Sequence, residues 1–105
     1  MDVLQRIKRL TLRGRLGFSL KSREEMHSCG LYIDDIVECI ITAQTIAKTL
    51  RSRSSLRRYS GEKLYVIKSF NFNGTAIYTK GAIVREPDGE DRYYLVSSKT
   101  VAFGE

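Results

Sequence analysis

The chain has 105 residues, of which 42% are hydrophobic and 29% are charged, and its formal net charge is +6 at pH 7. This length fits a single small domain over residues 1–105, and one proline with eight glycines disfavours a disordered chain. Two cysteines without Cys-x-x-Cys spacing and one histidine disfavour a zinc site or a disulfide framework. No apolar run reaches the ~20 residues of a membrane span, and the basic N-terminal segment lacks the apolar core of a signal peptide. We therefore expect a cytoplasmic protein without metal or cofactor, and the positive charge favours a negatively charged partner.

The first part of the chain carries three helical patterns. Residues 2–12 are expected to form a basic amphipathic helix, because apolar side chains recur near a 3.6-residue period at Val3, Leu4, Ile7 and Leu10. A second, short helix is expected after Ser19 and should end at Gly30. A third is expected over residues 32–44, with Asp34 as its cap and a buried stripe made of Ile36, Val37, Ile40 and Ile41.

The rest of the chain carries β patterns. Residues 45–52 alternate and are rich in β-branched side chains, which favours a strand or an extended edge. Further strands are expected over residues 63–70, 75–86 and 92–101, with turn signals at Asn73-Gly74 and Pro87-Asp88-Gly89. Helices followed by such strands predict an α+β fold, with two or three helices packed on one face of an antiparallel β-meander.

A two-residue turn at Asn73-Gly74 would decide which side chains share a face of the sheet. In that register Phe70 pairs with Ile77, and the face expected to pack on the helices carries Leu64, Val66, Phe70, Ile77 and Ile83. The opposite face then carries Lys63, Tyr65, Ser69, Tyr78 and Lys80. A longer turn would shift the register by one residue, but Tyr78 and Lys80 share a face in either case.

Aromatic rings beside lysines on an open sheet face suit single-stranded nucleic acid, because bases stack on rings while cations hold phosphates. A basic segment leads into this face and contains Lys48, Arg51, Arg53, Arg57 and Arg58. The alternative is that the tyrosines reflect β propensity and that the basic run is a solvated loop. The chain has no phosphate-binding loop and no convincing pair of carboxylates for a two-metal nuclease. A nuclease of this composition would therefore use lysine and arginine to stabilise charge, and tyrosine or lysine to transfer protons.

The order of these elements, together with Phe18-Ser19, "DDIVECII", "IAKTL" and "IYTKGAIV", resembles the MqsR-like toxins of bacterial toxin–antitoxin modules. It is also similar to the related RelE-type domains, over roughly residues 3 to 101. The resemblance implies helices packed on an antiparallel sheet, metal-independent cleavage of messenger RNA, and control by an antitoxin protein. It places the family's lysine on Lys48 and the family's Tyr-x-Lys on Tyr78 and Lys80. The family's glutamine in the preceding strand has no counterpart in "KLYVIKSF", where Lys68 or Ser69 falls.

The basic segment and the sheet face, together with this resemblance, favour a messenger RNA endoribonuclease, and the resemblance implies RNA and a cognate antitoxin as its partners. The residues expected to act in catalysis are Lys48, Arg57, Tyr78 and Lys80. Those expected to bind RNA are Arg51, Arg53, Arg58, Lys63, Tyr65 and Lys68. The main alternative is a non-catalytic RNA- or DNA-binding module that uses the same basic loop and sheet face, and a third is a structural protein that binds an acidic polypeptide.

Overall fold

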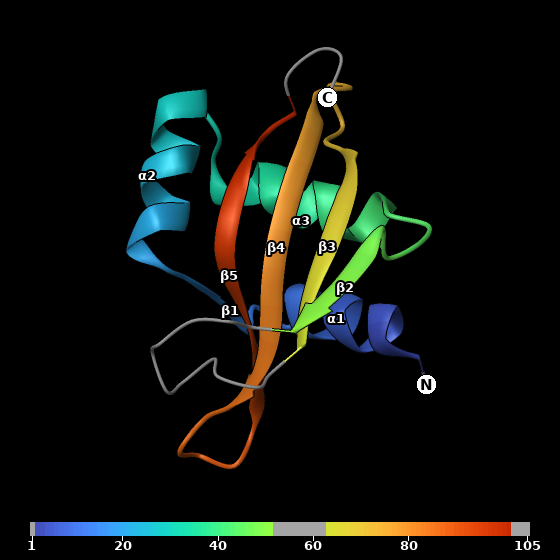
Figure 1. Cartoon of the computed structure of the whole chain (residues 1–105), viewed down its shortest axis with the longest axis vertical. Helices are drawn as coiled ribbons and strands as arrows, with labels where there is room; N and C mark the ends of the chain where they lie inside the picture. The colour runs from blue at the N-terminus through green and yellow to red at the C-terminus, as the bar shows by residue number, and fades with distance from the viewer. Residues whose placement is uncertain (1, 52–62, 102–105) are drawn as a thin grey trace.

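The protein is an α+β fold in which helices pack on a five-stranded sheet (Figure 1). The computed structural model describes residues 2–51 and 63–101. Its helices are α1 (Val3–Leu12), α2 (Leu20–Cys29) and α3 (Ile33–Thr42). Its strands are β1 (Leu16–Phe18), β2 (Lys48–Arg51), β3 (Lys63–Phe70), β4 (Ala76–Arg85) and β5 (Asp91–Thr100). The α+β prediction and the order of its elements are confirmed.

The sheet has the strand order β1-β5-β4-β3-β2, and it is mixed rather than purely antiparallel. Strands β2 to β5 form the expected antiparallel meander. The additional strand β1 runs parallel to β5, with Leu16 opposite Tyr93. Strand β1 was not predicted, because three residues, one of them a glycine, are too few to show the alternation that identifies a strand.

Local hydrogen bonds explain where the helices begin. The Asp2 carboxylate accepts the Gln5 N–H at 2.8 Å at the start of α1, and the Ser19 hydroxyl accepts the Ser22 N–H at 3.0 Å at the start of α2. The prediction that Asp34 caps α3 is wrong. The cap is Tyr32, whose N–H donates to the Asp35 carboxylate at 2.8 Å, and Asp34 lies inside the first turn.

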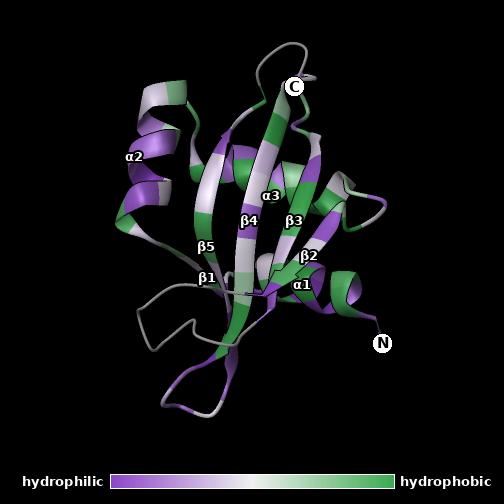
Figure 2. Cartoon of the chain, in the orientation of Figure 1, coloured by the Kyte–Doolittle hydropathy of each residue, from purple (hydrophilic) through white to green (hydrophobic). Residues whose placement is uncertain are grey.

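Helices α1 and α3 lie behind the sheet in Figure 1, whereas α2 runs alongside β5. Figure 2 shows hydrophobic residues on α1, α3 and the central strands, while α2 is mostly hydrophilic. The fully buried apolar core between the helices and the sheet contains Ile7, Ile36, Cys39, Ile40, Ile67, Ile77, Tyr93 and Leu95. Across residues 2–51 and 63–101, no helix is both long enough and apolar enough to cross a membrane.

The register between β3 and β4 differs by one residue from the expected one. Lys68 lies opposite Tyr78, and Phe70 lies opposite Ala76. The prediction of a two-residue turn at Asn73-Gly74 is therefore wrong. Asn71 extends the connection, because its N–H donates to the Thr75 carbonyl at 3.1 Å and its side-chain oxygen accepts the Asn73 and Thr75 N–H groups at 3.0 and 2.8 Å.

The expected faces are correct for β4 and wrong for β3. Ile77 packs in the helix-facing core, and Tyr78 shares the other face with Lys80. On β3, however, Tyr65 and Ile67 pack in the helix-facing core, so Leu64, Val66, Lys68 and Phe70 lie on the open face. Alternation could not decide between the faces of β3 because both are apolar. Leu64 is buried in a second cluster on the open face, with Ala82, Val84, Leu50, Tyr94 and Val96.

Candidate nucleic-acid interface

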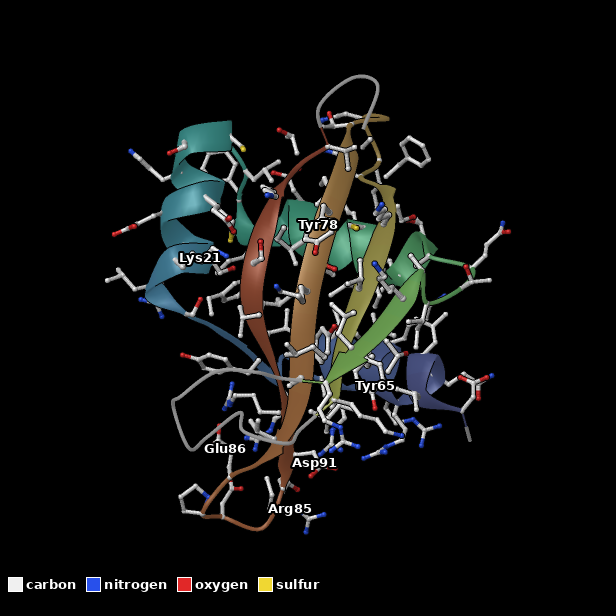
Figure 3. The ribbon with its side chains drawn as sticks, in the orientation of Figure 1. Lys21, Tyr65, Tyr78, Arg85, Glu86 and Asp91 are labelled. Carbon is white, nitrogen blue, oxygen red and sulfur yellow. The ribbon has the colours of Figure 1, made fainter. Side chains whose placement is uncertain are left out.

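A row of three side chains crosses the open face of the sheet at Tyr78. The register places Lys68 of β3 and Lys99 of β5 on either side of Tyr78 of β4. The Nζ atoms of Lys68 and Lys99 lie 6.0 and 5.5 Å from the centre of the Tyr78 ring. Both distances are within the range of a cation–π contact. The Tyr78 ring and the ammonium groups of Lys68 and Lys99 therefore form one cluster. Figure 3 shows Tyr78 near the middle of this face.

A second row lies one pleat further along the same face. Lys48 of β2 is opposite Val66, Val66 is opposite Lys80, and Lys80 is opposite Ser97 of β5. Lys80 is two residues from Tyr78, so the two side chains leave β4 on the same side. The structure thus brings together four of the predicted site residues, Lys48, Lys68, Tyr78 and Lys80. We call these residues and Lys99 the lysine–tyrosine face.

Within residues 2–51 and 63–101, no ion pair neutralises the charge of the lysine–tyrosine face. The ion pairs between side chains in the described part of the chain involve only arginines, and they gather around Asp88, Glu90, Asp91 and Glu86. Lys48, Lys68 and Lys99 are all exposed, whereas Lys80 is half-buried. Such a concentration of one sign of charge favours a negatively charged ligand.

The environment of Lys80 lowers the pKa of its side chain below the ordinary value for lysine. Partial burial is the main cause, and the positive charges of Lys21 and Lys99 act in the same direction, while Glu25 opposes them. The Glu25 carboxylate is itself occupied, because it accepts the Ser97 hydroxyl at 2.8 Å and the Ser98 N–H at 3.0 Å. Lys80 therefore gives up its proton more readily than an ordinary lysine does.

A small hollow lies beside the Tyr78 ring. Its volume is about 240 Å³, and it is lined by Lys68, Tyr78, Lys99, Thr100 and Val101. Sites for drug-sized ligands occupy roughly 300–1,000 Å³. The hollow therefore suits one small group, such as a phosphate or part of a nucleotide, between two cations.

Other predicted site residues lie elsewhere or cannot be placed. Lys63 and Tyr65 are not on the lysine–tyrosine face, which corrects the expectation. They line a different hollow together with Arg6, Ile83, Arg85 and Asp91. Arg51 lies opposite Lys63 at the far end of β2 from Lys48. Arg53, Arg57 and Arg58 lie outside the described residues.

The arginines near Lys63 and Tyr65 belong to a structural network. Asp91 binds Arg6 at 3.2 Å and Arg85 at 3.0 Å, and Arg92 binds Glu86 at 3.1 Å. Figure 3 shows Arg85, Glu86 and Asp91 at the β4–β5 hairpin, at the opposite end of the sheet from Tyr78. Because these arginines already have carboxylate partners, their charge is less available to a ligand than that of the lysines.

Two lysines were missed from the sequence: Lys99, which lies on the lysine–tyrosine face, and Lys21, whose charge acts on Lys80. Lys99 faces Tyr78 only because the β4–β5 register shifts between Lys80 and Gly81. The pairing at Arg85 and Asp91, continued without that shift, would place Ser98 opposite Tyr78. Lys21 acts from α2, whose position beside β5 has no signal in the local sequence.

Among residues 2–51 and 63–101 there is no group of three or more histidine, cysteine, aspartate or glutamate side chains that could hold a metal ion. Searches against protein-family models, curated proteins and solved structures found no match to this chain.

Proposed function

We propose that this chain is a metal-independent endoribonuclease that cleaves messenger RNA in the cytoplasm, as the toxin of a toxin–antitoxin module held in check by a cognate antitoxin. The observation that supports the proposal best is the lysine–tyrosine face, where Tyr78 lies between Lys68 and Lys99 and shares its side of β4 with Lys80. The resemblance of "IYTKGAIV" to the MqsR-like toxins gives these same two residues, Tyr78 and Lys80, a role in cleavage.

RNA can be cut without a metal because it carries its own nucleophile. In the proposed reaction the ribose 2′-oxygen attacks the adjacent phosphorus, and the bond from phosphorus to the 5′-oxygen of the next nucleotide breaks. The 2′-hydroxyl loses a proton, and the departing 5′-oxygen gains one. The products are a 2′,3′-cyclic phosphate and a free 5′-hydroxyl, so no co-reactant is consumed.

The residues of the face match the needs of this reaction. Lys68 and Lys99 stabilise the negative charge that develops on the phosphate, because cations held next to a reacting phosphate favour its charged transition state. Lys80, whose pKa is lowered, accepts the 2′-hydroxyl proton. Tyr78 supplies a proton to the leaving oxygen, and Lys48 holds the neighbouring backbone. Arg57, outside the described residues, remains a proposed phosphate ligand.

The test is cleavage of a long messenger RNA by the purified full chain in excess EDTA, followed by analysis of the product ends. We expect discrete cuts that persist in EDTA and that carry 2′,3′-cyclic phosphate and 5′-hydroxyl ends. DNA of the same sequence, which lacks the 2′-hydroxyl, should stay intact. RNA that stays intact, or cuts with 3′-hydroxyl ends, would contradict the proposed reaction.

A second candidate function is a non-catalytic RNA-binding module on the same face. It is favoured by the fact that Glu25, the acid that acts on Lys80 among the described residues, is already hydrogen-bonded to Ser97 and Ser98. Proton transfer therefore depends on Tyr78 and Lys80 alone among the described residues of this face. This candidate predicts salt-dependent binding of RNA that stays intact.

A further inference from the structure

Phe70 is an exposed aromatic residue at the end of the lysine–tyrosine face. Its side chain is 56% exposed, although it belongs to the sheet. It follows Lys68 by two residues on β3, so it leaves the strand on the same face. Ala76, the residue opposite Phe70, is small and leaves the ring uncovered on that side. A single exposed apolar side chain is common on a protein surface, so the Phe70 ring is informative only through its position beside Tyr78 and Lys68 on the charged face.

Phe70 and Tyr78 are diagonal neighbours on the same face. Phe70 lies opposite Ala76, and Tyr78 lies opposite Lys68, so the two aromatic residues are offset by one pleat on adjacent strands. Diagonal neighbours in an antiparallel pair are about 7–8 Å apart, within reach of aromatic side chains. A group next to the phosphate held at Tyr78 would therefore meet the Phe70 ring.

The backbone around Phe70 is fixed from the back of the sheet by α3. The Thr42 hydroxyl lies 2.8 Å from the Phe70 carbonyl oxygen. The Asn71 side-chain amide donates to the Asp35 carboxylate at 3.0 Å, and the Phe72 N–H donates to the Glu38 carboxylate at 2.8 Å. The strand end that carries the ring is thus ordered before any ligand arrives, which lowers the entropic cost of binding.

We propose that Phe70 is a stacking platform for an unpaired base next to the scissile phosphate, and that the substrate is therefore single-stranded RNA. This inference rests on the proposed binding of RNA at the lysine–tyrosine face. A base inside a duplex is stacked on its neighbours and offers no free ring face to Phe70, whereas a base in a single strand does. Stacking on a ring requires no hydrogen bonds to base edges, so the platform tolerates different bases.

The test measures the binding of a fluorescent single-stranded RNA in which 2′-O-methyl groups prevent cleavage. Phe70→Ala and Phe70→Leu should each weaken binding by roughly 5- to 150-fold, because a stacked base contributes about that much to affinity. Phe70→Trp, which keeps an aromatic ring at this position, should bind the RNA about as tightly as the wild-type protein. The matched control is Phe72→Ala, because Phe72 is 69% exposed and lies on the adjacent turn, outside strand β3.

The outcomes separate this inference from the function on which it rests. Wild-type protein that binds the RNA while Phe70→Ala and Phe70→Leu bind it equally well would overturn the stacking platform and leave RNA binding standing. Wild-type protein that prefers duplex RNA would also overturn the inference, and wild-type protein that binds no RNA would overturn both.

Discussion

Changing Tyr78 to phenylalanine and Lys80 to alanine together is expected to lower RNA cleavage by roughly 10²–10⁴-fold, the usual effect of removing positioned proton-transfer groups. Growth arrest on expression of the chain should disappear with it. The expectation follows from the position of both side chains on one side of β4, where the Tyr78 ring contacts two of the cations that would hold the phosphate. The measurement is the initial rate of cleavage of one messenger RNA at fixed salt.

The matched control is the double variant Lys63→Ala and Tyr65→Phe. These residues are also a lysine and a tyrosine two positions apart on a central strand, but they line a hollow away from Tyr78. This control should cleave RNA at close to the wild-type rate. If the control loses activity and the Tyr78/Lys80 variant keeps it, the candidate site is on the wrong face.

The pH dependence of cleavage tests whether Lys80 accepts a proton or only contributes positive charge. Partial burial, Lys21 and Lys99 lower the pKa of Lys80, so the neutral amine becomes more abundant at a given pH than for an ordinary lysine. If Lys80 accepts the 2′-hydroxyl proton, the rate rises as the pH approaches this lowered pKa and then levels off. Lys80→Arg keeps the charge but remains protonated, so it should bind RNA and lose the rising limb of the pH profile.

Neutralising the lysines of the face is expected to reduce the salt dependence of RNA binding. For single-stranded nucleic acid, log K falls with log salt with a slope of about −0.7 per phosphate contact. The triple variant with Lys48, Lys68 and Lys99 changed to glutamine should therefore have a slope smaller by about 2. The measurement is the dissociation constant of the uncleavable RNA at four or five salt concentrations.

Arginines that already have carboxylate partners provide the control for this slope. Arg6 and Arg85 both bind Asp91, at 3.2 and 3.0 Å. Arg6→Gln together with Arg85→Gln removes two positive charges from the chain and should change the slope little. Equal changes in slope per positive charge removed, in the two-arginine and the three-lysine variants, would show that net charge, rather than the lysine–tyrosine face, attracts the RNA.

Sequence patterns predict the order of elements well and the β3 face poorly, for a physical reason. The 3.6-residue spacing of apolar side chains identified α1 and α3, because each helix buries only one face. Strand β3 is apolar on both sides, with Ile67 in one cluster and Leu64 in the other, so its alternation is ambiguous. The Asn71 side chain then decided the register, and no pattern of hydrophobic residues reports that contact.

Some residues of the candidate site could be predicted from the sequence, and others could not. Tyr78 and Lys80 were predictable as a pair, because residues two apart on a strand share a face in every register. Lys99 was not predictable, because it faces Tyr78 only through the register shift between Lys80 and Gly81. Phe70 was expected among the helices and is exposed instead, because the register and the face of β3 both differ from the expected ones.

The most direct test of the account is a map of backbone amide chemical shifts as uncleavable single-stranded RNA is added to the isotope-labelled chain. The account predicts that the largest changes fall on the lysine–tyrosine face and its rim, at Lys68, Phe70, Tyr78, Lys80 and Lys99. Changes confined to the opposite side of the sheet, around Arg6, Tyr65 and Arg85, would contradict it.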